Sequence, residues 1–364
     1  LAVQQDPDYC FPLRVEEIEI LREAQRQNSA DALAHYCLGN LMYEKQPGVA
    51  VREWEAAAAL DASIATVYRN LARAQVEMRR DVRSAIPMME RAIELDTADP
   101  RLYYERDLLY AAAGVPLAER LAELERAGDV VIRHNDALGR KVVLLTQLGR
   151  YDEAIDLMQT HHFRRWEGLG NIHTTYVDAH LLRAQQHLVA GRFSEAITDY
   201  ERALEYPANL EAAQPFTGGR ECQVYYLMGQ TYTAAGDHSE AMRYYELATT
   251  VKRPTSRSML DYYQGMALLR IGRTREARQL FDGLTDYANR RLQTLQTGSS
   301  IEFFTKFGSR RALDEQRAGA YYLLGLASLG NGNPSNGRAM LYQALEHDPN
   351  HLWAREQLAQ LSRD

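Results

Sequence analysis

The sequence has few cysteines, no cluster of cations and no long apolar segment. Its three cysteines, Cys10, Cys37 and Cys222, are too scattered for a disulfide framework or a zinc knuckle. We expect buried thiols in a reducing compartment. No run approaches the roughly 18 apolar residues that a membrane span needs, and the segment from Leu1 to Tyr9 contains no signal-peptide core. The expected location is therefore the cytoplasm, with no membrane partner.

The charged residues do not suit a nucleic-acid groove. The net charge is −7, and Lys and Arg are interspersed with Asp and Glu. Neutralising phosphates requires clustered cations, so nucleic acid is not an expected partner. Hydrophobic residues make up 46% of the chain and charged residues 25%, which excludes disorder throughout and predicts a folded protein.

Motifs that carry catalysis are also missing. There is no Gly-rich phosphate loop, no Gly-x-Ser-x-Gly elbow and no His-Glu-x-x-His pair. His180 and His187 are seven residues apart on one face of a predicted helix, so a metal site is conceivable. No acidic residue joins them at ligand spacing, and surface or capping histidines are the favoured interpretation. We therefore expect no catalytic residue, no metal site and no cofactor in this chain.

What the sequence does contain is helix-forming residues. Ala, Leu, Arg, Glu and Gln dominate, whereas runs of Val, Ile and Thr with period two are nearly absent. Glycines stand between helix-length segments, each near the end of an apolar-periodic run: Gly114, Gly149, Gly191, Gly236, Gly272 and Gly332. This regular spacing predicts an all-α chain made of internal repeats.

Three segments share one pattern of small and large residues. Their matching positions are Tyr225-Tyr226, Gly229, Ala241 and Tyr245; Tyr262-Tyr263, Gly265, Ala277 and Phe281; and Tyr321-Tyr322, Gly325, Leu341 and Ala344. The pattern resembles that of tetratricopeptide repeats. The glycine in the first helix would let the second helix approach, with an alanine against it. The large residue would fill the wedge toward the next repeat.

The resemblance predicts a right-handed superhelical solenoid of about eight helical hairpins. Residues 1–30 form a leading segment and helix, 31–205 repeats 1–5, 206–220 a connecting loop, and 221–364 repeats 6–8. The last stretch includes an insertion over 283–316 and a final helix, His351 to Ser362, that is expected to cap the stack. The loop and the insertion could each mark a break between two sub-stacks.

Protein binding is the usual role of such a stack, whose concave face is lined by the first helix of each repeat. Tyrosine occupies the same inner position in four repeats: Tyr36, Tyr226, Tyr262 and Tyr322. Two interpretations stay open. Either the rings form a recognition surface for a protein or peptide, or they pack between helices.

A carboxylate clamp, which holds a peptide C-terminus through Lys and Asn, is known from chaperone-binding tetratricopeptide domains. Asn40 and Asn70 fall at the two asparagine positions, and Arg106 falls at the final basic one. Tyr36 and Leu102 replace the two lysines, which removes most of the charge-assisted hydrogen bonds. The polar residues join the tyrosines as candidates for partner binding, but recognition of a chaperone tail is disfavoured.

Several blocks between the repeats carry a second resemblance. They are Asp8–Arg14, Trp54-Glu55, Tyr68–Ala72, Phe163–Gly170, Tyr206–Leu210 and Ile301–Phe307. In this order they are similar to the C-terminal repeat region of large bacterial proteins that carry a mutarotase-like β-sandwich before it. The resemblance implies a role in carbohydrate metabolism, with any catalytic activity in a missing upstream domain.

Two of these blocks are predicted contact loops. Trp166 and Glu167 lie among glycines, whereas Phe303, Phe304 and Phe307 lie in the otherwise polar insertion. Exposed aromatic residues in a polar loop often mark contacts. We expect both loops to contact the missing N-terminal domain or a second subunit of a homo-oligomer. The alternative is that they fold back on their own stack.

Two classes of function are left open. In the first, the chain is a non-catalytic scaffold that binds a protein, a peptide or its own missing domain. In the second, it is the repeat portion of a carbohydrate-active enzyme and contributes loops to the sugar site or to oligomerisation. Trp166 beside Glu167 would then be the first place to look, because an aromatic platform beside a carboxylate suits sugar binding.

Overall fold

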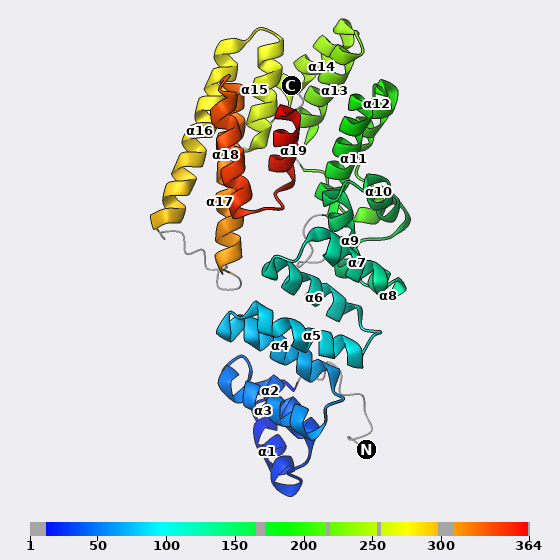
Figure 1. Ribbon diagram of the computed structural model, residues 1–364, viewed down its shortest axis with the longest axis vertical. Coiled ribbons are helices and arrows are strands. Elements are labelled where there is room, and N and C mark those ends of the chain that lie inside the picture. The colour runs from blue at the N-terminus through cyan, green and yellow to red at the C-terminus, as the bar shows by residue number, and fades with distance from the viewer. Residues whose placement is uncertain (1–11, 165–171, 216–218, 253–255, 298–308, 363–364) are drawn as a thin grey trace. The chain divides into compact units, whose positions relative to one another are not determined.

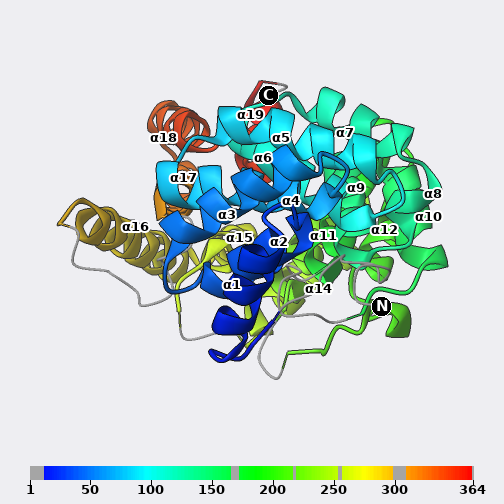
Figure 2. The ribbon, with the colours of Figure 1, turned by 90° about the horizontal axis from the view of Figure 1, so that it is seen from below.

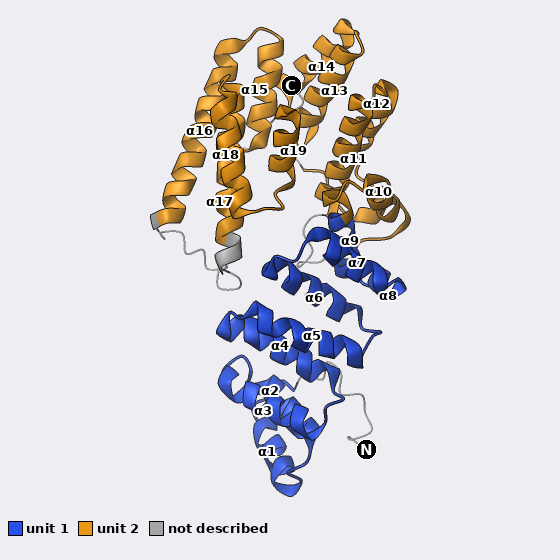
Figure 3. Ribbon diagram, in the orientation of Figure 1, with its two compact units in different colours: residues 1–144 blue, residues 145–364 orange. Residues whose placement is uncertain are grey.

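The computed structural model describes residues 12–164, 172–215, 219–252, 256–297 and 309–362. Every regular element within these ranges is helical. The chain divides into two compact units, unit 1 over residues 1–144 and unit 2 over residues 145–364 (Figure 3). The predicted all-α class is therefore confirmed for the described residues, and each unit is considered by itself below.

Unit 1 begins before helix α1 and ends inside α9. Its helices are α1 (Glu17–Gln27), α2 (Ala32–Met42), α3 (Pro47–Leu60), α4 (Ala65–Arg79), α5 (Val82–Leu95), α6 (Pro100–Ala113), α7 (Leu117–Arg126), α8 (Asp129–Ile132) and α9 (Asn135–Gln147). Consecutive helices pack as hairpins, α2 on α3, α4 on α5 and α6 on α7. The leading helix α1 packs on α2, with Ile18 and Leu21 against the core of the first hairpin.

Unit 2 continues the same pattern. Its elements are α10 (Tyr151–Thr160), α11 (Ile172–Val189), α12 (Phe193–Arg202), the 3-10 turn η2 (Ala208–Leu210), α13 (Glu221–Ala234), α14 (His238–Thr250), α15 (Met259–Arg270), α16 (Thr274–Thr297), α17 (Ser309–Gly330), α18 (Pro334–His347) and α19 (Leu352–Leu361). The hairpins are α11 with α12, α13 with α14, α15 with α16, and α17 with α18. Figures 1 and 2 both show α16, α17 and α18 next to one another.

The small residues of the repeat pattern are where the helices approach each other. A methyl group at Gly229 would lie 2.6 Å from the Tyr245 ring, and one at Gly265 would lie 2.4 Å from the Phe281 ring. Only glycine leaves room for these rings. The large residue thus packs on the glycine of its own repeat. Phe281 also comes within 2.4 Å of the Cβ position at Gly330 in α17, so it reaches the next repeat as predicted.

The turn glycines end the first helices in the expected way. The backbone angle φ lies between 73° and 83° at Gly114, Gly149, Gly191, Gly236, Gly272 and Gly332. This is the left-handed region, where glycine bears no steric cost. The turn after α4 has Arg80 in the same region, with φ of 54°, so one repeat keeps the turn without its glycine.

The structure describes most of the two segments that separate repeats 5 and 6 and repeats 7 and 8. Much of the predicted insertion is helical, because α16 continues to Thr297 and α17 begins at Ser309. Gly283 lies inside α16, where an added Cβ would be 2.8 Å from the Arg257 guanidinium; it marks a close side-chain approach and not a helix end. The boundary between the units falls inside α9, and not at 206–220 or 283–316.

Both cysteines that the structure describes are thiols. Cys222 is buried, as expected, whereas Cys37 is half-buried; Cys10 lies outside the described residues. None of the described helices is long and apolar enough to cross a membrane.

Candidate functional site

The final helix packs on the last hairpin of unit 2, as expected of a cap, and also makes contacts elsewhere in the unit. Helix α19 packs on α18. It also contacts α11 and the end of α9, through residues that lie 175 and 208 positions earlier in the sequence. Figure 1 shows α19 (red) between α18 and α13. Polar residues of this helix contact the unit, and Gln357 is only 5% exposed.

Three side chains of α19 donate hydrogen bonds to α9 and α11. These bonds run from Trp353 Nε1 to Asp178 Oδ1 (2.9 Å), from Arg355 Nη2 to the carbonyl of Gln147 (2.6 Å) and from Gln360 Nε2 to Gln185 Oε1 (3.1 Å). Two of these bonds come from the first turn of the helix and one from its last turn. Together they define its position along unit 2.

Arg220 supports the central contact. Its guanidinium lies over the Trp353 ring, 5.2 Å from the centroid, in cation–π geometry. Its Nη1 also pairs with Asp178 Oδ1 at 2.9 Å. The same carboxylate oxygen therefore accepts from both the indole and the guanidinium, which places Trp353 between α11 and the start of α13.

The beginning of α19 is held by His351, the N-cap residue. Its Nδ1 accepts a hydrogen bond from the backbone N–H of Ala354 at 3.2 Å, which requires the neutral ring. The ring also packs on Tyr322 of α17, with centroids 4.8 Å apart. Burial lowers the pKa of His351, and the carboxylates of Asp348 and Asp178 oppose this change. We call the residues that receive the helix, Gln147, Asp178, Gln185, Arg220 and Tyr322, the α19-binding face.

The half-buried Arg220 also belongs to a second group of polar side chains, which we call the donor cluster: Arg220, Gln223, Tyr263 and Tyr322. Arg220 Nε donates to Gln223 Oε1 at 2.5 Å. Arg220 Nη2 is buried without a hydrogen-bond partner among the described residues, whereas the Tyr263 hydroxyl interacts with the side chains of Gln223 and Tyr322. Burial raises the pKa of Tyr263 to about 12, although the nearby Arg220 and Gln223 oppose the change, so its hydroxyl stays protonated.

The four predicted inner-face tyrosines are all buried. Tyr36 is 0%, Tyr226 3%, Tyr262 7% and Tyr322 5% exposed. Tyr226 and Tyr262 both pack against Tyr263, with ring centroids 5.8 Å and 5.2 Å away. Of the two interpretations, packing between helices describes these positions. Tyr322 also packs on His351, the N-cap residue of α19.

The candidate clamp residues pair with one another inside unit 1. Asn70 Nδ2 donates to Asn40 Oδ1 at 2.9 Å, and the Trp54 indole donates to the same oxygen at 3.0 Å. Arg106 is 8% exposed and pairs with Glu123 at 3.0 Å. Their hydrogen-bonding atoms are thus used in packing the hairpins. The predicted contact residues Trp166, Glu167, Phe303, Phe304 and Phe307 lie outside the described residues.

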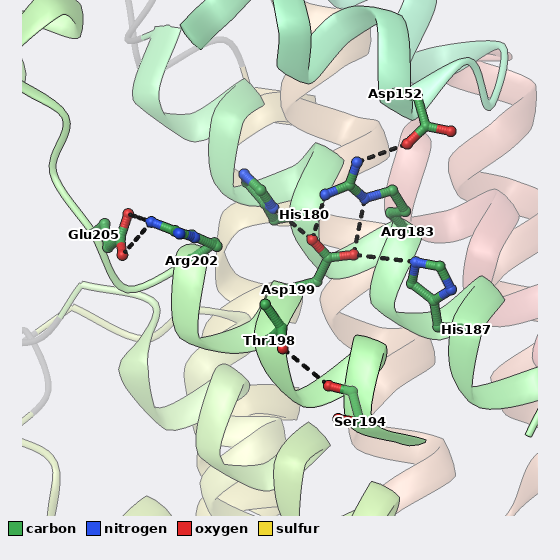
Figure 4. A network of polar contacts seen from close by, with 9 residues as sticks. All are labelled: Asp152, His180, Arg183, His187, Ser194, Thr198, Asp199, Arg202 and Glu205. Atoms are coloured by element: carbon green, nitrogen blue, oxygen red, sulfur yellow. Dashed lines mark hydrogen bonds and ion pairs between the residues drawn. The ribbon is translucent and has the colours of Figure 1, made fainter. Parts of the chain in front are cut away.

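The predicted histidine pair belongs to a charged network in α11 and α12 (Figure 4). Asp199 accepts from His180 Nδ1 at 2.9 Å and from Arg183 Nη2 at 2.6 Å, and His187 Nε2 lies 3.6 Å from its other oxygen. Arg183 continues to Asp152 at 2.6 Å. Burial alone would raise the pKa of Asp199, but the hydrogen bonds from His180 and Arg183 outweigh it and lower the pKa.

This network corrects the expectation of surface histidines. His180 is 0% exposed, and its acidic partner is on the next helix, which sequence spacing does not reveal. The described part of the chain holds no group of three His, Cys, Asp or Glu side chains arranged to bind a metal ion. The guanidinium of Arg183 occupies both oxygens of Asp199, so the network is an ion-pair bridge between two helices.

Of the α19-binding face, sequence reasoning named Tyr322 and missed Gln147, Asp178, Gln185 and Arg220. Asp178, Gln185 and Tyr322 are on the first helices of their hairpins, where inner-face positions are expected. Their position within the repeat was the only feature of the sequence that could have indicated them. The donor for Asp178 comes from Trp353, and no local pattern connects these two positions.

Comparison with known proteins identifies the repeats. Residues 223–255 and 318–351 match the tetratricopeptide repeat family, so the chain contains tetratricopeptide repeats. A tetratricopeptide repeat protein from Parabacteroides merdae is similar in structure, with 16% identity, coverage of 86% of this chain and 99% of that chain, and a TM-score of 0.38. YrrB, described as a TPR protein with an unusual peptide-binding site, is 17% identical, with coverage of 64% of this chain and 91% of that chain and a TM-score of 0.34. Yeast Tom70 is 15% identical, with coverage of 82% of this chain and 60% of that chain and a TM-score of 0.34.

Proposed function

We propose that this chain of tetratricopeptide repeats is a non-catalytic protein-interaction scaffold whose unit 2 binds a helical protein segment on the α19-binding face. The observation that supports this most directly is that the chain's own α19 occupies that face. Docking of one helix against others is a recurrent mode of peptide recognition. In this view, α19 is an intramolecular ligand.

The contacts have the character of a recognition surface. Trp and Arg, the residue types that most often dominate binding energy, supply the two shortest contacts of α19, from Trp353 and Arg355. Few apolar side chains of the helix are fully buried, chiefly Trp353 and Ala354. Hydrogen bonds at fixed positions therefore determine which helix fits, and a different helix with matching donors can take its place.

A peptide of residues 349–362 tests the proposal in the full-length chain. Tethering gives α19 an effective concentration in the millimolar range, so an added peptide competes poorly with the native helix. Trp353→Ala in the chain weakens this competitor. We expect a labelled peptide to bind the variant at least about tenfold more tightly than it binds the native chain, since a central Trp truncation costs about 2 kcal/mol or more, as measured by fluorescence anisotropy.

The control is the same peptide with Trp353→Ala and Arg355→Ala, which lacks the donors for Asp178 and for the Gln147 carbonyl. We expect it to bind neither chain at the concentrations that saturate the native peptide. Equal binding of both peptides, or no binding of the native peptide to the Trp353→Ala chain, would contradict the proposal.

The finer parts of the sequence interpretation remain proposals. They are a bacterial origin, a cytoplasmic location, self-association and a place in a larger protein with a mutarotase-like domain. The resemblance of the inter-repeat blocks supports the last of these. The alternative function, a repeat portion that lends loops to a sugar site, depends on Trp166 and Glu167, and a glycan-binding screen of the chain with its upstream sequence would test it.

A further inference from the structure

The contact between α19 and the rest of unit 2 is centred on one indole. Trp353 is 6% exposed, and its indole N–H donates to Asp178 Oδ1 at 2.9 Å. The Arg220 guanidinium lies over the ring, 5.2 Å from its centroid. The edge and the face of the indole thus contact different groups, the edge an anion and the face a cation.

The two groups that contact the indole are positioned by residues outside α19. Arg220 Nη1 pairs with Asp178 Oδ1 at 2.9 Å, which joins the start of α13 to α11. Arg220 Nε donates to Gln223 Oε1 at 2.5 Å. A receptor group that is already held in its bound geometry loses little freedom when a ligand arrives. We therefore expect the Asp178–Arg220 pair to keep its geometry when α19 leaves the α19-binding face.

The two contacts together favour tryptophan over every other side chain. The indole N–H is a donor only, which suits an oxygen that carries negative charge, and the tryptophan face is the best aromatic partner for a guanidinium. Phenylalanine offers the face without the donor, whereas the hydroxyl of tyrosine lies at the far end of its ring. Lysine and arginine offer donors without the aromatic face.

We propose that the Asp178–Arg220 pair recognises a tryptophan on the partner helix that replaces α19 on unit 2. This inference rests on the proposed function and names the residue that the partner carries, a tryptophan in the first turn of its helix, as Trp353 is in α19. A site built to accept a hydrogen bond discriminates against a ligand that lacks the donor, because the acceptor then loses a bond where water does not replace it.

Two labelled peptides of residues 349–362 test this. One has the native sequence, and the other has 3-benzothienylalanine in place of Trp353, in which sulfur replaces the indole N–H and the size of the ring system is kept. Binding to the full-length chain with Trp353→Ala is measured by fluorescence anisotropy. We expect the native peptide to bind about tenfold more tightly than the analogue, since the analogue cannot donate to the Asp178 carboxylate.

Two further variants of the Trp353→Ala chain locate this preference. Asp178→Ala removes the acceptor, so the preference for the native peptide should fall to about twofold or less. The matched control is Asp348→Ala, which removes another carboxylate close to the start of α19. Asp348 does not accept from the indole, and the tenfold preference should remain.

The contribution of the guanidinium is tested separately. Arg220→Lys keeps a cation beside Asp178 but removes the planar group that lies over the ring. Both peptides have an aromatic face, so both should bind about threefold more weakly to this variant of the Trp353→Ala chain. Unchanged affinities would overturn the assignment of Arg220 to the site.

Equal affinities of the two peptides, or a tenfold preference that survives Asp178→Ala, would overturn the proposal while leaving helix binding by unit 2 intact. If the native peptide does not bind the Trp353→Ala chain, the proposed function itself fails.

Circular dichroism establishes that each chain is folded. If the Asp178→Ala chain is not, Asp178→Asn takes its place; its neutral oxygen accepts a bond about half as strong, so the preference should fall to about threefold, and an undiminished preference would contradict the proposal. If the Trp353→Ala chain is not folded, Arg355→Ala serves as the host. Its tethered helix weakens both peptides equally and leaves the ratio of their affinities unchanged.

Discussion

At the scale of single residues, Arg80 holds the conformation that glycine holds in six other turns. Its φ of 54° and ψ of 28° are left-handed, where a side chain costs about 1–2 kcal/mol. Arg80→Gly removes this strain but adds freedom to the unfolded chain. We expect a net gain of about 0.5–1 kcal/mol in the free energy of unfolding, measured in urea. Gly236→Ala should have the opposite sign, and a loss at Arg80→Gly would show that its backbone is unstrained.

Asp199 is a nearly buried carboxylate whose charge is stabilised by hydrogen bonds from two side chains. Its side chain is 4% exposed and accepts from both His180 and Arg183. Asp199→Asn leaves Arg183 without its buried partner. The expected loss in unfolding free energy is about 2 kcal/mol, below the value for fully buried pairs, because Arg183 is 23% exposed. Glu205→Gln, in the exposed pair with Arg202 (Figure 4), is the control and should have little effect in the same denaturant titration.

Single residues also show what the sequence could predict. The turn glycines and the close helix approach at Gly265 were predictable, because backbone sterics allow few other residues at these positions. The pairing of Asn40 with Asn70 was not, since the same register position serves either a ligand or a neighbouring helix. Tyrosine gives the same ambiguity, because its ring suits a core and its hydroxyl suits a surface.

At the scale of elements, the docking of α19 should depend on pH through His351. Burial lowers the pKa of this residue below its ordinary value of 6.5, so the docked helix binds fewer protons than the released one. The contribution of neutral His351 to the stability of the docked helix is complete above pH 6.5. It is lost as the pH falls below 6.5 through the lowered pKa of the docked state. Protonation also removes the acceptor for the Ala354 N–H and places a cation at a helix N-terminus.

His351→Asn provides the comparison, because asparagine keeps the capping acceptor and does not titrate. Between pH 7.5 and 5.5 the native chain should lose melting temperature relative to His351→Asn. Parallel curves for the two chains would mean that Asp178 and Asp348, the carboxylates that raise this pKa, compensate fully for burial.

The hairpins were predictable as elements because each pairs helices that are adjacent in the sequence. The position of α19 was not. A helix with one polar face is typical of a cap, whose polar face is exposed. The same amphipathic pattern results when the polar face contacts residues about 200 positions earlier in the chain, so the pattern does not distinguish the two cases. The extension of α16 past Gly283 was missed for a related reason, since a glycine can mark a close contact as well as a helix end.

At the scale of the whole molecule, irregular composition did not locate the division between units. The segment 206–220 is rich in proline and glycine, yet Asn209 binds it to the end of α10. Its side-chain amide donates to the carbonyls of Met158 and His161, both at 2.7 Å, and its own carbonyl accepts from the Phe163 N–H at 2.7 Å. Proline and glycine mark an irregular backbone and carry no information about how many contacts it makes.

The contacts of α19 predict that unit 2 is self-sufficient. Its partners, from Gln147 to Tyr322, all lie within residues 145–364, and repeat proteins are stabilised by neighbouring repeats. We expect a fragment of residues 135–364, which keeps α9 whole, to fold with α19 docked. Trp353→Ala should then lower the melting temperature of the fragment by about as much as that of the full chain.

A shorter fragment, residues 172–364, provides the matched control. It retains Asp178 and Gln185 but lacks Gln147, the acceptor for Arg355. Arg355→Ala should therefore lower the melting temperature of the 135–364 fragment and leave that of the 172–364 fragment nearly unchanged. The same loss in both fragments would place the stabilising contact of Arg355 elsewhere, and the reach of α19 to the end of α9 would then contribute nothing to stability.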